Sequence, residues 1–175
     1  MSGLDRNLST PDEHKRHAPR VVGCFVLTIS DSKTPETDVS GRLIRKLLEE
    51  GGHEVIGSKI VKDEPSQVEA VISEGCADQR VQAIVMTGGT GITSRDSTFE
   101  AVEAMLEKRL PGFGELFRML SYQEIGPAAM LSRAQSGVVR GRLVFSLPGS
   151  PNACRLALER LIIPELGHLV SEVSR

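Results

Sequence analysis

The chain has 175 residues, and its 21 lysines and arginines against 23 aspartates and glutamates give a formal net charge of −2 at pH 7. This length suits one globular domain that folds without disulfides or metals, and the charge balance argues against a broad cationic surface for nucleic acid. No apolar run approaches the ~20 residues of a membrane-spanning helix, and three cysteines without CxxC or Cys/His spacing indicate free thiols in a reducing cytoplasm.

The first twenty residues are mostly polar and lack the apolar centre of a signal peptide. We expect residues 1–20 to form a flexible tail in which His14 and His17 are solvated. Residues 21–175 are expected to form the folded domain.

Strand-like and helix-like segments alternate after the tail. The near-continuous apolar run at 21–29 is typical of a strand buried on both faces. The later predicted elements are a helix with Leu43 to Leu48 inward that stops at Gly51, strand 53–61, a helix opened by a capping box at 66–69, strand 81–86, a helix opened by a capping box at 97–100 and broken at Pro111, helical pieces at 115–121 and 127–134, strand 142–147, a helix from Ser150 to about Leu161, and a terminal helix. Strands separated by helices predict a three-layer α/β domain with a mostly parallel central sheet.

Polar residues follow each of the four predicted strands. Ligands of open parallel sheets bind outside the carboxyl ends of the strands, so these residues are expected to line one pocket, although connecting loops are polar in any case. The four clusters are Ser30-Asp31-Ser32, Lys62-Asp63-Glu64-Pro65, Thr87-Gly88-Gly89-Thr90-Gly91 and Pro148-Gly149-Ser150-Pro151-Asn152.

The glycine-rich cluster at 87–91 allows backbone N–H groups to approach an anion closely. It is not a Walker A loop, because no lysine follows at the required spacing. It is not a dinucleotide fingerprint either, because Ser94 stands where glycine or alanine is needed. A simple turn is the alternative, but the position between a buried strand and a helix favours a phosphate or pterin-like ligand.

Three aspartates, Asp31, Asp63 and Asp96, each precede a predicted helix. Each could be a helix-capping carboxylate. Together they could instead hold a hard cation, since Mg²⁺ prefers one or two carboxylates plus phosphate oxygens. No histidine lies at a strand end and no GxSxG motif occurs, which disfavours a serine hydrolase.

Several motifs in order resemble the MoaB/Mog family of molybdenum-cofactor biosynthesis proteins, whose relatives include the G domains of plant Cnx and of gephyrin. The resemblance runs from about residue 21 to the C-terminus. Its most specific segments are TGGTG at 87–91 with Arg95-Asp96, PGFGE at 111–115, MLSR at 130–133 and LPGSPNA at 147–153. The segments FRMLS at 117–121 and EIG at 124–126 are closer to the MoaB branch than to the Mog branch.

The resemblance implies a MoaB/Mog-like fold, cytoplasmic homotrimers or homohexamers, and adenylylation of molybdopterin by Mg-ATP with release of pyrophosphate. It implies that Asp63 and Asp96 hold Mg²⁺ and orient the phosphates. The residues expected to bind the substrates are Ser30, Asp31, Thr87, Gly88, Gly89, Thr90, Gly91, Ser132, Arg133, Pro148, Gly149 and Ser150. Arg133 is expected to be either a phosphate clamp or a structural partner for a loop carbonyl. A molybdopterin carrier without catalysis is the main alternative function, and a general nucleotide-binding or scaffold protein is a weaker one.

Overall fold

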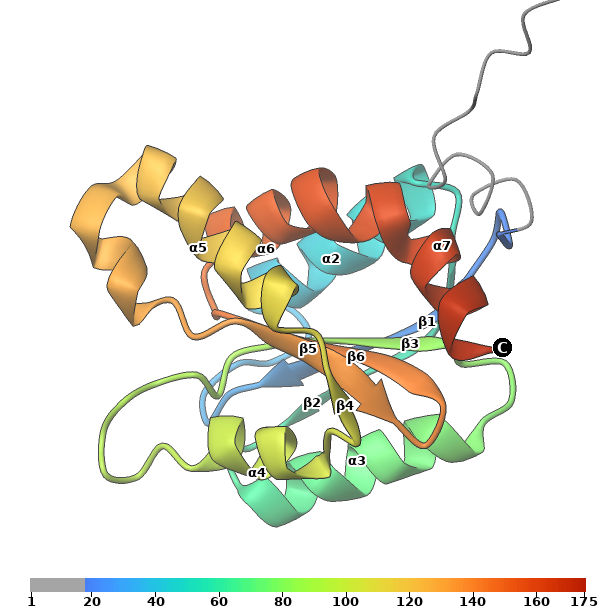
Figure 1. Cartoon of the computed structure of the whole chain (residues 1–175). Coiled ribbons are helices and arrows are strands. Elements are labelled where there is room, and N and C mark those ends of the chain that lie inside the picture. Colours follow the sequence, from blue (N-terminus) through green and yellow to red (C-terminus); the bar gives the residue numbers. More distant parts are fainter. Residues whose placement is uncertain (1–17) are drawn as a thin grey trace, which may run out of the picture.

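A six-stranded sheet runs through the centre of the computed structural model, which describes residues 18–175 (Figure 1). The strand order is β2-β1-β3-β6-β5-β4, where the first four strands are parallel to one another and β5 pairs antiparallel with both β6 and β4. The strands are β1 (Gly23–Ile29), β2 (Glu54–Val61), β3 (Ala83–Thr87), β4 (Lys108–Arg109), β5 (Gln135–Val139) and β6 (Arg142–Leu147). Most of the predicted tail, residues 1–17 with His14 and His17, lies outside the described residues.

Helices cover both faces of this sheet (Figure 1). One layer contains α2 (Val39–Glu50), α5 (Pro111–Ile125), α6 (Pro151–Ala157) and α7 (Ile163–Val173), and the other contains α3 (Pro65–Ala77) and α4 (Thr98–Met105). The alternation along β1 explains its continuous apolar sequence, because Cys24 and Val26 face the first layer and Leu27 and Ile29 face the second. The predicted three-layer α/β domain with a mostly parallel sheet is confirmed.

The four predicted strands are present within two residues of their expected bounds, but β4 and β5 were missed. Strand β4 is only two residues long, and β5 contains Ser136 and Gly137, which weaken any strand pattern. These two strands extend the parallel sheet with an antiparallel edge.

The predicted capping boxes are wrong in detail. Helix α3 begins at Pro65, one residue before the expected serine, and its N-cap Glu64 makes no side-chain capping bond. Proline is suited to the first helical position by its fixed φ, so it moves the start of the helix. Ser97 is the N-cap of α4 without a capping bond, whereas Ser150 caps α6 as predicted by accepting from the N–H of Ala153 at 3.2 Å.

The helices after β4 differ from the prediction in length. Pro111 opens α5, which continues to Ile125 as one helix and ends at Gly126 with φ of +63°. A 3-10 helix, η1 (Gly126–Leu131), follows it. Helices α6 and α7 join through a π-helical turn, η2 (Leu158–Ile162), just before Pro164, which has no N–H to donate.

The three cysteines are free and buried, as predicted. Burial raises the pKa of the Cys24 thiol to about 12. Among residues 18–175, no helix combines the length and the apolar character needed to cross a membrane.

Candidate functional site

The carboxyl ends of β1, β2, β3 and β6 meet at one edge of the sheet, because these neighbouring strands are parallel. The loops that follow them line two adjacent cavities. The first, of about 350 Å³, is lined by Ser30, Gly88 and Gly149 among others, and is called the glycine cavity below. The second, of about 240 Å³, is lined by Asp31, Asp63, Thr93, Arg95 and Asp96, and is called the acidic cavity.

Hydrogen bonds between distant loops hold the walls of the glycine cavity. The Thr87 hydroxyl donates to the carbonyl of Pro148 at 3.0 Å, and the Ser40 hydroxyl donates to the carbonyl of Gly149 at 2.8 Å. Thr87 is buried, so its hydroxyl acts within the scaffold. The loops after β3 and β6 are therefore fixed to each other and to the start of α2.

The loop at 87–91, called the glycine loop below, has backbone conformations that require glycine. Gly88 and Gly89 have φ of +94° and +66°, and a side chain at Gly88 would meet the carbonyl of Ile29. The N–H of Gly88 donates to the carbonyl of Leu147 at 3.0 Å. Within the part of the chain that the structure describes, the N–H groups of Gly89, Thr90 and Gly91 donate to no other group, which leaves them available to an anion.

Asp31 joins the three loops around the acidic cavity. Its Oδ1 accepts from the N–H of Asp63 at 3.1 Å, and its Oδ2 accepts from Arg95 at 3.2 Å. Asp31 does not cap a helix, because the N-cap of α2 is Asp38. Its carboxylate therefore positions the loops that carry Asp63 and Arg95.

Asp96 is fixed by its own loop. Its Oδ2 accepts from the N–H and from the hydroxyl of Thr93, each at 2.8 Å. These hydrogen bonds lower the pKa of Asp96, and the nearby charges of Arg133 and Arg95 lower it further. Asp96 therefore stays ionised without capping α4, whose N-cap is Ser97.

Asp63 has a buried carboxylate oxygen without a hydrogen-bond partner among the described residues. Its Oδ1 is buried and has no hydrogen-bond partner within residues 18–175, and Glu64 rather than Asp63 is the N-cap of α3. A buried carboxylate oxygen without a partner is costly unless a ligand completes it, and carboxylate oxygen is the donor that Mg²⁺ prefers. No group of three or more metal-ligating side chains occurs in the described residues, so a cation here would also need ligand oxygens.

Arg133 contacts the backbone of the glycine loop. Its Nε donates to the carbonyl of Thr90 at 3.1 Å, its other nitrogens contact the carbonyl of Gly91 and the carboxylate of Glu100, and its guanidinium lies 4.4 Å from the ring centre of Phe99. These contacts match the expected structural role, in which Arg133 holds a loop carbonyl, and the phosphate clamp stays a prediction.

The structure does not bring every predicted site residue into these cavities. The carbonyl of Pro148 accepts from Thr87 in the wall of the glycine cavity, Ser150 caps α6, and Ser132 bonds through its N–H to the carbonyl of Ala129 at 3.0 Å. Gly89, Thr90, Gly91, Ser132, Arg133, Pro148 and Ser150 line neither cavity.

Asp38 is a site residue that the sequence reasoning missed. It is 6% exposed, accepts from the N–H of Gly41 at 2.8 Å and from the hydroxyl of Thr28 at 2.7 Å, and lines the glycine cavity. An aspartate three residues before Gly41, at the start of a periodic apolar segment, is the helix-start signal that could have found it.

Comparisons with known proteins agree with this architecture. The sequence profile of a family described as "probable molybdopterin binding domain" matches residues 25–168. Molybdenum cofactor biosynthesis protein B of Bacillus subtilis (strain 168) is 51% identical over 164 residues, which cover 93% of this chain and 96% of the relative. The protein of the same name from Halalkalibacterium halodurans is 52% identical over 163 residues, with 93% and 96% coverage.

Solved structures give the same result. A crystal structure of a molybdenum cofactor biosynthesis protein B superposes with a TM-score of 0.87 at 51% identity, covering 90% of this chain and 99% of the other. The tungsten cofactor synthesizing protein MoaB from Pyrococcus furiosus superposes with a TM-score of 0.81 at 38% identity, covering 90% and 100%.

Proposed function

The chain belongs to the family of probable molybdopterin-binding domains that includes the molybdenum cofactor biosynthesis proteins B, and on this premise we propose that it transfers the adenylyl group of ATP to molybdopterin. Because the chain belongs to this family, it has a role in molybdenum cofactor biosynthesis. The adenylyl transfer is supported mainly by one observation: Asp63, whose buried Oδ1 has no partner among the described residues, lines a cavity together with Asp31 and Asp96, next to the glycine cavity.

In the proposed reaction, an oxygen of the terminal phosphate of molybdopterin attacks the α-phosphorus of ATP. A new P–O bond forms, the bond from the α-phosphorus to the bridging β-oxygen breaks, and pyrophosphate leaves with that electron pair. A phosphate monoester is already ionised at neutral pH, because its second pKa is about 6. The step therefore needs no histidine base, and among the described residues no histidine lines either cavity.

Catalysis of this kind depends on alignment and on the neutralisation of phosphate charge. Asp63 and Asp96 fit a magnesium ion, which supplies that neutralisation when it is bound with the phosphates. The N–H groups of Gly89, Thr90 and Gly91 lie outside the lining of both cavities and have no acceptor among the described residues, so they are neutral donors for a phosphate that reaches this loop. Asp31 keeps the backbone of Asp63 in place through its hydrogen bond to the N–H.

The test measures pyrophosphate release by the purified protein with molybdopterin, ATP and Mg²⁺. Asp63→Asn keeps the size of the side chain and removes its charge. We expect turnover to fall about 100-fold, or about 2.7 kcal/mol in activation free energy, while molybdopterin affinity changes less than about threefold. Asp78→Asn is the matched control, because Asp78 lies just beyond the C-terminal end of α3 and pairs with Arg80.

Normal turnover in Asp63→Asn would refute the role given to Asp63. Binding of molybdopterin without pyrophosphate release under any metal condition would identify a carrier instead of an enzyme.

We further propose that the chain acts in the cytoplasm as a homotrimer or homohexamer, with small-molecule substrates as its ligands. Its three free thiols support a reducing compartment. Exposed large apolar side chains along α5 and η1 provide a surface for assembly, and a monomeric mass in light scattering would contradict this. These side chains are Leu116, Met119, Tyr122, Ile125, Met130 and Leu131.

A further inference from the structure

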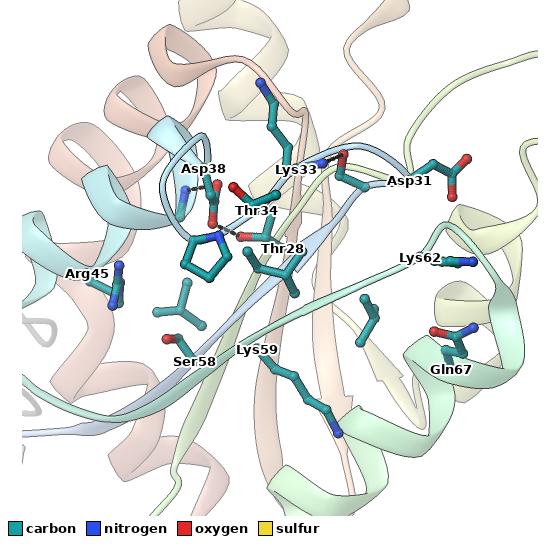
Figure 2. A pocket seen from close by; sticks show the side chains of 16 residues that line it. Thr28, Asp31, Lys33, Thr34, Asp38, Arg45, Ser58, Lys59, Lys62 and Gln67 are labelled. Atoms are coloured by element: carbon teal, nitrogen blue, oxygen red, sulfur yellow. Dashed lines mark hydrogen bonds between the residues drawn. The ribbon is translucent and has the colours of Figure 1, made fainter.

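A pocket between α4, the N-terminus of α5 and β5 lies apart from the candidate site and is called the α4–α5 pocket below. It has a volume of about 270 Å³. In the part of the chain that the structure describes, it shares no lining residue with the glycine cavity or the acidic cavity. A wider cleft of about 640 Å³ over β1 and β2 belongs instead to the candidate site, because it shares Lys33 and Asp38 with the glycine cavity (Figure 2).

Arg118 is a half-buried cation in the lining of the α4–α5 pocket. Its guanidinium lies against Gly114, one turn earlier on α5, since a Cβ added at Gly114 would be 3.0 Å from Nη1 of Arg118. Arg118 makes no hydrogen bond or ion pair with any residue of 18–175, whereas Arg109, the other cation of the pocket, pairs with Glu103 at 3.0 Å. A guanidinium left without a partner favours a carboxylate, which it can bind through two parallel N–H groups.

Two further features of the pocket favour an anionic group. The N-cap of the 15-residue helix α5 is Leu110, which makes no side-chain capping bond, so the partial positive charge at this helix end is uncapped. Ser136 of β5 is 3% exposed, and its hydroxyl is buried with no partner among the described residues. The two features are adjacent, because the N–H of Leu110 donates to the carbonyl of Ser136 at 2.8 Å. A buried hydroxyl without a partner is costly, so an accepting ligand would stabilise it.

The pocket also contains a free negative charge and apolar surface. Glu115 is exposed and forms no ion pair within residues 18–175, so it balances the charge of Arg118. The apolar surface comes from Phe99, Leu106 and Pro111. A ligand with one anionic group, one cationic group and a short apolar group would complement all three parts of this lining.

We propose that the α4–α5 pocket binds a small zwitterion, an α-amino acid with an apolar side chain. Its carboxylate binds Arg118 and the hydroxyl of Ser136 beside the N-terminus of α5, its ammonium lies toward Glu115, and its side chain packs on Leu106 and Phe99. The pocket volume is just below the range of about 300–1,000 Å³ that drug-sized ligands occupy, which suits a ligand smaller than a nucleotide.

The pocket adjoins the residues that support the glycine loop. Gln135 lines the pocket and donates through Nε2 to the carbonyl of Phe99 at 2.8 Å. The ring centre of Phe99 lies 4.4 Å from the guanidinium of Arg133, which contacts the carbonyls of Thr90 and Gly91. A bound amino acid packs against the same phenylalanine, so it stabilises the arrangement that holds the glycine loop.

The experiment measures binding of L-leucine to the full chain by calorimetry, together with two analogues of the same shape. Isocaproate lacks the ammonium of leucine, and isoamylamine lacks its carboxylate. We expect isocaproate to bind about threefold more weakly than leucine, because a contact to the exposed Glu115 is partly screened by water. We expect isoamylamine to bind about tenfold more weakly, because it loses the charge-assisted contact to Arg118.

Two variants locate the site. Arg118→Met is expected to weaken leucine binding about tenfold; Arg155→Met is the matched control, because Arg155 lies on α6, pairs with Glu159 and does not line the pocket. Ser136→Ala is expected to weaken leucine binding about threefold and to leave the Tm of the ligand-free protein unchanged or higher, because it removes a buried hydroxyl that has no partner in the described fold. A purely structural role of Ser136 would instead lower that Tm.

The proposal would be overturned by a wild-type protein that does not bind leucine at millimolar concentrations, by equal binding of the three compounds, or by unchanged leucine binding in Arg118→Met. A lower mass of Arg118→Met than of the wild type in light scattering would also overturn it, because the guanidinium would then bind a carboxylate of a neighbouring copy. These outcomes do not depend on pyrophosphate release, so the proposed adenylyl transfer is tested separately.

Discussion

Replacement of Arg133 by methionine separates the two roles that the sequence left open for this residue. The arginine side chain is 23% exposed and holds the glycine loop through the carbonyls of Thr90 and Gly91. It also pairs with Glu100 and lies over Phe99. Methionine keeps the length of the apolar stem and removes every one of these polar contacts.

The magnitude follows from those contacts. A hydrogen bond from a charged donor contributes about 1.5–3 kcal/mol, a half-exposed ion pair about 0–1 kcal/mol, and the cation–π contact about 0.5–1 kcal/mol. These contributions are not additive, because water and methionine replace part of what is lost. We expect the free energy of unfolding to fall by about 2–3 kcal/mol, which lowers Tm by about 4–12 °C for a domain of this size.

Thermal unfolding followed by circular dichroism measures this change, with Arg95→Met as the control. Arg95 belongs to the same loop but is 80% exposed and makes one ion pair, with Asp31, so its loss should cost less than about 1 kcal/mol. An unchanged Tm for Arg133→Met, together with weaker binding of Mg-ATP or molybdopterin, would refute the structural role and make Arg133 a phosphate clamp.

Two further predictions concern the same loop. Gly88→Ala is expected to lower the free energy of unfolding by about 1–3 kcal/mol in urea, because φ is +94° there and the new methyl group meets the carbonyl of Ile29. The control is Gly112→Ala, in open space on α5, which should instead raise the free energy of unfolding by about 0.4–1 kcal/mol. Equal effects of the two substitutions would contradict this reasoning. Thr93→Val removes a hydroxyl donor, so the pKa of Asp96 should rise toward its ordinary value of about 3.9 in a carbon-13 NMR titration. Since the folded pKa of Asp96 lies below the unfolded one, ionised Asp96 stabilises the fold above the unfolded pKa, and this stabilisation is lost as pH falls through the folded pKa. An unchanged titration curve would show that the Thr93 hydroxyl does not cause the shift, because the variant keeps the N–H of this residue.

Local sequence patterns were sufficient for the layered architecture. The apolar run of β1, the short buried strands and the amphipathic helices between them follow from residue type and spacing, which act within a few residues of the chain. The same patterns located the polar ends of the four parallel strands, because parallel connection brings those ends to one edge.

The local patterns failed where several weak signals compete. Both predicted capping boxes had the right residues, yet neither serine makes its capping bond. At α3 the fixed φ of Pro65 decided the start of the helix. The residues of β4 and β5 give little strand signal of their own. These strands form by pairing, β5 with β6 and β4 with β5, at the edge of the packed sheet.

The site itself required the tertiary structure. Asp31 meets the N–H of Asp63, 32 positions away, and Arg133 meets the carbonyl of Thr90, 43 positions away. The unpartnered oxygen of Asp63 is likewise defined by what does not pack against it in the described fold. The sequence by itself determined the elements and the chemical types at the sheet edge, because propensity and periodicity are local; only the packed structure decided which groups are committed to the scaffold and which are left for a ligand, because that depends on contacts between distant segments.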